Sequence, residues 1–82
     1  MKSFDVLKTT YSVRKVNANK IIRKYDKINY YFCVCETVTL VCGRTITERL
    51  IAFKSRWDAK DYLDALKSNN NELMQEIEKK SF

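Results

Sequence analysis

Residues 28–41, INYYFCVCETVTLV, constrain the fold more than any other stretch, because β-branched and aromatic residues dominate them. Their even positions form one apolar face, and Cys42-Gly43 supplies a turn before residues 44–53, RTITERLIAF. Alternation with a period of two is typical of strands with one buried face. We therefore expect an antiparallel hairpin at the centre of the fold.

Two further strands are predicted before this hairpin. Residues 4–16 alternate between apolar and polar positions, and residues 17–19, NAN, are typical of a turn. Residues 20–25 are expected to form a short second strand, which a turn at residues 26–27, DK, closes. The chain from 4 to 53 is thus predicted to be a four-stranded antiparallel meander.

The register of this meander follows from its charges. If Val41 lies opposite Arg44, the acidic residue on the apolar face, Glu36, lies opposite Arg49. An opposite-charge pair across two strands stabilises a sheet modestly. The same register predicts an apolar row across three strands, formed by Ile21, Phe32 and Phe53.

The last third of the chain has the period of a helix. Ser55 and Asp58 have the spacing of a capping box, which predicts a helix over about 56–68. Its apolar stripe consists of Ala59, Tyr62, Leu63 and Leu66. Trp57 lies on the opposite side of this helix, and a second short helix is expected over 71–80.

The predicted fold is α+β: a four-stranded antiparallel β-meander, then one packed α-helix and a short C-terminal helix. Eighty-two residues have room for one core, so residues 1–82 are expected to form a single domain. A core of this size contributes only a few kcal/mol net, and a homodimer is one expected source of further stability.

Positive charge is concentrated in the predicted sheet. Residues 1–55 carry eleven Lys or Arg and four Asp or Glu, a net +7, whereas residues 56–82 carry five and six, a net −1. Residues 14–27, RKVNANKIIRKYDK, are strongly basic. This polarisation is typical of proteins that bind nucleic acid.

The predicted register gathers these cations around a tyrosine on the face opposite the core. The cations would contact phosphate, and the ring would stack on a base or sugar. The expected nucleic-acid-binding residues are Lys8, Arg14, Lys20, Arg23, Lys24 and Tyr31. The alternative is that these charges only keep an exposed sheet soluble and block pairing between sheet edges.

An apolar patch is expected on the same face. Its members are Cys33, Cys35, Val41, Ile46, Leu50 and Ala52. Either the C-terminal helix covers this patch through Leu73, Met74 and Ile77, or the patch is a dimer or partner interface. Trp57 either packs on a sheet edge or anchors an interface. The expected partner-interface residues are Ile46, Leu50 and Trp57.

Catalysis has little support in the sequence. There is no His, the commonest general base, and no phosphate-binding loop or nucleophile elbow occurs. Cys33 and Cys35 lack the C-x₂-C spacing of zinc sites. We expect a non-enzymatic protein with no cofactor and no metal.

Other features of the sequence bear on the cellular location of the protein and on its source. The odd number of cysteines, 3, fits a reducing compartment, and no stretch resembles a signal peptide or a membrane span. We therefore expect a cytoplasmic protein without a membrane partner. Lys, Asn, Ile, Tyr and Phe, which have AT-rich codons, are abundant, and this is typical of phages, mobile elements or AT-rich bacteria.

Residues 51–67, IAFKSRWDAKDYLDALK, resemble the strand-to-helix junction of AP2-like arm-binding domains of phage and transposon integrases. The matching residues are Phe53, Ser55, Asp58, Ala59 and Leu63. In those domains a three-stranded sheet backed by one helix binds the DNA major groove, so the resemblance implies DNA binding through a sheet face. This chain departs from the family because it lacks the hairpin glycines and has an additional predicted strand.

Two functions from different classes are expected. The first is non-enzymatic binding of nucleic acid through the Lys/Arg-rich sheet face. The second is that of a small phage or mobile-element protein that binds and inhibits a host protein, such as a nucleic-acid-processing defence factor. The expected partner is nucleic acid or an acidic protein surface, because both are attracted by the same basic face.

Overall fold

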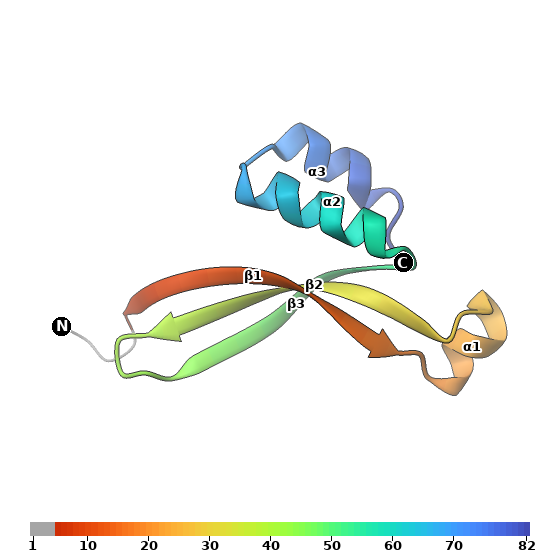
Figure 1. Ribbon diagram of the computed structural model, residues 1–82, viewed down its shortest axis with the longest axis horizontal. Coiled ribbons are helices and arrows are strands. Elements are labelled where there is room, and N and C mark those ends of the chain that lie inside the picture. The colour runs from red at the N-terminus through yellow and green to blue at the C-terminus, as the bar shows by residue number, and fades with distance from the viewer. Residues whose placement is uncertain (1–4) are drawn as a thin grey trace.

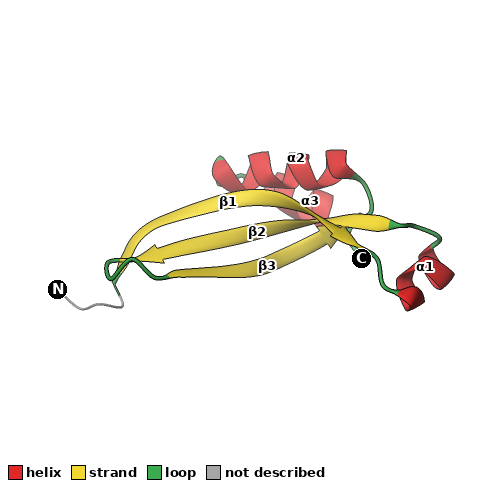
Figure 2. Ribbon diagram, turned by 60° about the horizontal axis from the view of Figure 1, so that its bottom comes forward, coloured by secondary structure: helices red, strands yellow, loops and turns green. Residues whose placement is uncertain are grey.

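The computed structural model describes residues 5–82, so the predicted start of the sheet at residue 4 lies outside the described part. Its elements are β1 (Val6–Asn17), α1 (Lys20–Asp26), β2 (Tyr30–Leu40), β3 (Thr45–Phe53), α2 (Arg56–Lys67) and α3 (Asn71–Glu78). The strands form one antiparallel sheet in the order β1-β2-β3, and α2 and α3 lie side by side on one of its faces (Figures 1 and 2). The predicted α+β fold with an antiparallel sheet is confirmed.

The core lies between this sheet face and the two helices. Its buried residues come from both layers and are Val34, Phe53, Ala59, Tyr62, Ala65 and Ile77. The Tyr62 hydroxyl donates a hydrogen bond to Glu78 Oε1 at 3.2 Å, which links α2 to the end of α3. Trp57 is 71% exposed on the outer side of α2, as its place on the helical wheel predicts.

The predicted four-stranded sheet is wrong, because residues 20–26 form the helix α1. Asn19 caps this helix by accepting a hydrogen bond from the Ile22 N–H at 2.9 Å, and Lys27 ends it in the left-handed region at φ 56°. The helix lies at one end of the sheet (Figure 1). There the Asp26 carboxylate lies 3.0 Å from Lys54 Nζ.

The predicted apolar row forms only in part. Phe32 lies opposite Phe53 on β3, as expected. On β1, however, Lys15 lies opposite Phe32, and Ile21 belongs to α1 with 68% of its surface exposed. The row fails because it depended on a strand that does not form.

The turn between β2 and β3 shifts the predicted register by one residue. The Leu40 N–H donates to the Arg44 carbonyl at 2.8 Å, so Leu40, and not Val41, lies opposite Arg44. A three-residue hairpin loop typically ends with a residue in the left-handed region. Gly43 occupies this place at φ 89°, where a side chain would be strained.

The shifted register extends from the hairpin turn to a bulge in β3, and beyond the bulge the strands pair in the predicted register. Cys35 lies opposite Arg49, and Leu50 is the extra residue before the predicted pairing resumes. Because a slip of one residue exchanges the two faces of a strand, the predicted Glu36–Arg49 pair is wrong. Glu36 instead lies opposite Glu48.

This register predicts that Glu48→Lys stabilises the protein. A lysine opposite Glu36 replaces a repulsion by an attraction, which raises the free energy of unfolding by up to ~1 kcal/mol. Urea denaturation measures the gain, and the same change in a Glu36→Gln background is the control, where the gain should vanish. A gain that persists in that background would contradict the register.

Candidate nucleic-acid interface

The sheet face opposite α2 and α3 is here called the free face. Alternate residues of each strand lie on it, as the registers and the position of the core show. They are Lys8, Thr10, Ser12, Arg14 and Val16 of β1, Tyr31, Cys33, Cys35, Thr37 and Thr39 of β2, and Thr45, Thr47, Arg49 and Ala52 of β3. None of these residues is acidic, because the two glutamates of the sheet, Glu36 and Glu48, lie on the other face.

Three cations flank the central strand on the free face. Arg14 on β1 lies opposite Cys33, and Arg49 on β3 lies opposite the nearby Cys35. Lys8 lies further along β1, towards the β2–β3 turn. All three cations are exposed, and none forms an ion pair with another residue among residues 5–82.

Hydroxyl groups make up much of the rest of the free face. Two rows cross all three strands: Lys8, Thr39 and Thr45, and Thr10, Thr37 and Thr47. The Thr37 and Thr47 hydroxyl oxygens are 3.1 Å apart, within hydrogen-bond distance. Threonine hydroxyls are common donors to phosphate oxygens and also contact base edges.

Two thiols lie between the free-face cations. Cys33 and Cys35 are 2% and 0% exposed, although no helix covers this face over residues 5–82. Burial raises the pKa of the Cys33 thiol, and the nearby Arg49 and Arg14 charges only partly oppose that effect. Cys33 is therefore a neutral thiol at neutral pH, and it contributes packing to this face rather than a reactive thiolate.

Tyr31 lies at the end of the free face nearest α1. Its ring meets Phe82 edge-on, with ring centroids 5.3 Å apart. The Phe82 N–H donates to the Ala52 carbonyl at 3.1 Å, and Lys54 Nζ lies 5.6 Å from the Phe82 ring centroid. Tyr31 is thus part of a small aromatic group at one end of the sheet.

Three of the predicted nucleic-acid-binding residues lie off the free face. Lys20, Arg23 and Lys24 are exposed on α1, beyond the end of the strands. The prediction that Lys20 and Lys24 share a sheet face with Lys8 and Arg14 is wrong, because it required a strand over 20–25. Their contact with nucleic acid stays a prediction from the sequence alone, and the free-face interface does not include them.

The predicted apolar patch is not continuous. The shifted register places Ile46 opposite Val38 on the helix-bearing side, and Leu50 is the extra residue of the bulge. The C-terminal helix does not cover the free face, because Ile77 of α3 packs in the core on the other side. The predicted interface residues Ile46, Leu50 and Trp57 are 47%, 41% and 71% exposed.

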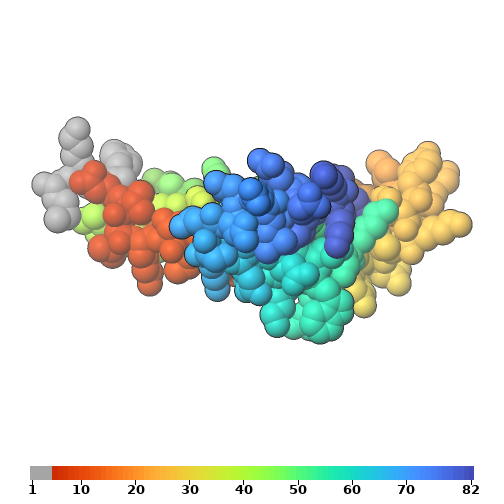
Figure 3. All heavy atoms as spheres, turned by 90° about the horizontal axis from the view of Figure 1, so that it is seen from above, coloured from red at the N-terminus to blue at the C-terminus, as the bar shows by residue number. Residues whose placement is uncertain are grey.

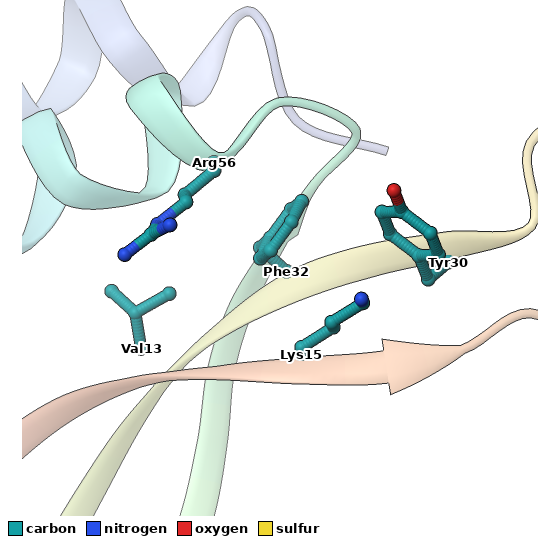
Figure 4. Close-up of a pocket in the computed structure, with 5 residues that line it drawn as sticks. All are labelled: Val13, Lys15, Tyr30, Phe32 and Arg56. Carbon is teal, nitrogen blue, oxygen red and sulfur yellow. The ribbon is translucent and has the colours of Figure 1, made fainter.

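A second cationic site lies on the helix-bearing side of the sheet (Figure 4). An open cavity of about 450 Å³ is lined by Val13, Lys15, Tyr30, Phe32 and Arg56. Lys15 Nζ lies 3.9 Å from the Tyr30 ring centroid, and the Arg56 side chain points towards Val13. Sequence reasoning missed this site, because only the β1–β2 register and the start of α2 bring Lys15 and Arg56 to one cavity.

No protein-family model, curated protein or solved structure matches this chain. Over the described residues, no helix is both long and apolar enough to cross a membrane.

Proposed function

We propose that this protein is a non-enzymatic DNA-binding module that contacts double-stranded DNA through the free face. The observation that carries the proposal is that the free face has three cations of the strands and none of their carboxylates. Lys8, Arg14 and Arg49 lie on the free face, whereas Glu36 and Glu48 lie on the other side. A phosphate backbone is attracted to such a face and meets no carboxylate of the strands there.

The side chains of the free face favour a duplex over a single strand. Sites for single strands stack bases on aromatic side chains. Tyr31 is the one aromatic residue among the free-face residues of the strands, and its ring already contacts Phe82. Hydroxyl and guanidinium groups contact phosphates and base edges without unstacking the bases.

The width of the sheet favours DNA over RNA. Three strands at a spacing of about 4.8 Å extend over about 10 Å, close to the ~12 Å width of the B-DNA major groove. The major groove of an RNA duplex is too narrow for side chains to read. In the proposed complex, Lys8, Arg14 and Arg49 contact phosphates, and the threonine rows face the groove.

A second candidate function is inhibition of a host protein with an acidic surface. Trp57 favours it, because this side chain is 71% exposed and follows directly on Arg56 of the cationic cavity. Buried tryptophan and arginine residues dominate the binding energy of many protein interfaces. In this case Trp57→Ala would weaken partner binding and leave any DNA affinity unchanged.

The proposal is tested by fluorescence anisotropy with labelled duplex DNA, its single strand and duplex RNA of the same sequence. We expect duplex DNA to bind with a Kd below ~10⁻⁴ M at ~0.15 M salt, and the other two to bind more weakly. If the Kd for duplex DNA is above ~10⁻⁴ M, the nucleic-acid function is rejected. Tighter binding of the single strand would remove the assignment to duplex DNA.

A further inference from the structure

Helix α1 presents an apolar stripe and a basic stripe to solvent. Ile21 and Tyr25 are 68% and 75% exposed, and their spacing of four residues places them on one side of the helix. Lys20 and Lys24 have the same spacing and lie beside them. Exposed isoleucine and tyrosine side chains on one turn of a helix are typical anchors of a helix that binds in a groove.

Two contacts join the ends of this helix segment to the sheet. The Ala18 N–H donates to the Asn29 carbonyl at 2.9 Å, which closes the segment that contains α1. The Asp26–Lys54 ion pair at 3.0 Å ties the end of α1 to the chain that follows β3. α1 is therefore held at one end of the molecule, apart from α2 and α3 (Figure 3).

The groove between α2 and α3 has the complementary chemistry. Its volume is about 520 Å³, and its lining residues are Asp61, Asp64, Leu73, Glu76, Ile77 and Lys80. Leu73 is 43% exposed and also lines the adjacent hollow together with Glu72. Lys80 Nζ lies 3.7 Å from the Asp58 carboxylate, which offsets the one positive charge of the groove.

We propose that α1 of one copy of this protein binds in the α2–α3 groove of a second copy. Ile21 and Tyr25 would contact Leu73, and the lysines of α1 would face the carboxylates of the groove. Opposite charges steer such an encounter and fix its orientation. Asp61 and Asp64 form no ion pair with another described residue of their own chain, so they are available to the lysines.

The contact forms between copies, because α1 lies at the end of its own sheet, whereas α2 and α3, which line the groove, lie over the middle of that sheet (Figures 1 and 3). The two surfaces differ, so the contact either forms twice in a reciprocal two-fold dimer or repeats head-to-tail from copy to copy. Neither surface contains a free-face residue, so the inference does not depend on DNA binding.

Sedimentation velocity without DNA tests the proposal with two charge-reversed variants. Lys20→Glu/Lys24→Glu makes α1 acidic, and Asp61→Lys/Asp64→Lys makes the groove basic. Each variant alone opposes like charges, so we expect self-association at least ~10-fold weaker than that of the wild type. An equimolar mixture of the two variants should associate again. The wild-type α1 of the groove variant can bind the wild-type groove of the α1 variant, and the acidic α1 can bind the basic groove.

Two further variants separate this contact from general effects of charge and folding. Arg44→Glu/Arg56→Glu makes the same charge change outside both surfaces and should associate like the wild type. Ile21→Ala/Tyr25→Ala keeps every charge and should weaken association, with an unchanged circular dichroism spectrum. A wild type that stays monomeric up to ~1 mM, or a mixture that does not recover association, would overturn the proposal.

Discussion

Replacement of Phe53 by alanine is expected to destabilise the protein by ~3–5 kcal/mol, the largest effect of any single substitution considered. Phe53 is 0% exposed and lies between the sheet and α2. The centroids of the Phe53 and Tyr62 rings are 5.7 Å apart. A small domain has a total stability of ~5–15 kcal/mol, so the loss removes much of it. The cavity would lie where both layers of the core meet.

Denaturation followed by circular dichroism measures this loss, and Phe82→Ala is the matched control. Phe82 is 50% exposed, so removal of the same ring there should cost less than ~1 kcal/mol. Equal costs at the two positions would mean that Phe53 is not at the centre of the core.

The second large effect is expected on DNA binding. Arg14→Gln/Arg49→Gln removes two of the three free-face cations of the strands. Each charged hydrogen bond to phosphate contributes ~1.5–3 kcal/mol, so the double variant should bind duplex DNA at least ~100-fold more weakly. Glutamine keeps a polar side chain with part of the aliphatic stem at both positions.

Lys60→Gln/Lys67→Gln is the matched control, because it removes the same charge from α2 instead of the sheet. We expect only a small loss of affinity, of about 3-fold, from the lower net charge. Comparable losses of affinity in the two variants would show that DNA binding depends on the net charge and not on the cations of the free face.

The elements set by local chemistry could be predicted from the sequence. Ser55 caps α2 by accepting a hydrogen bond from the Trp57 N–H at 3.2 Å, and Ala59 and Tyr62 are buried as the helical period predicts. The β-branched and aromatic run of β2 likewise forms a strand. Capping and hydrophobic period involve residues close in sequence, so no knowledge of the tertiary fold is needed.

Helix α1 was missed because its seven residues are too few to show a period. Asn19 before KIIRKYD was the available signal, since Asn is among the best N-cap residues. The spacing of four between Ile21 and Tyr25 was a second signal. The β-branched pair at 21 and 22 favours a strand, but short helices also tolerate it.

The candidate site was predicted in part. Lys8, Arg14 and Tyr31 lie on the free face, because the alternation within β1 and β2 fixed their side of the sheet. Arg49 was missed, because a one-residue error at the hairpin turn assigns it to the opposite face. Turn geometry of this kind is decided by the positive φ of Gly43 together with the bulge, and hydrophobic alternation does not determine it.

The salt dependence of duplex DNA affinity is the sharpest test of DNA binding through the free face, because it counts the phosphate contacts. Three contacts from Lys8, Arg14 and Arg49 predict a log–log slope of about −2.7. In Arg14→Gln/Arg49→Gln one contact remains, so the slope should become shallower, at about −0.9. In Lys20→Gln/Lys24→Gln the slope should stay near −2.7. An unchanged slope in the arginine variant, or an equal reduction in the lysine variant, would contradict DNA binding through the free face.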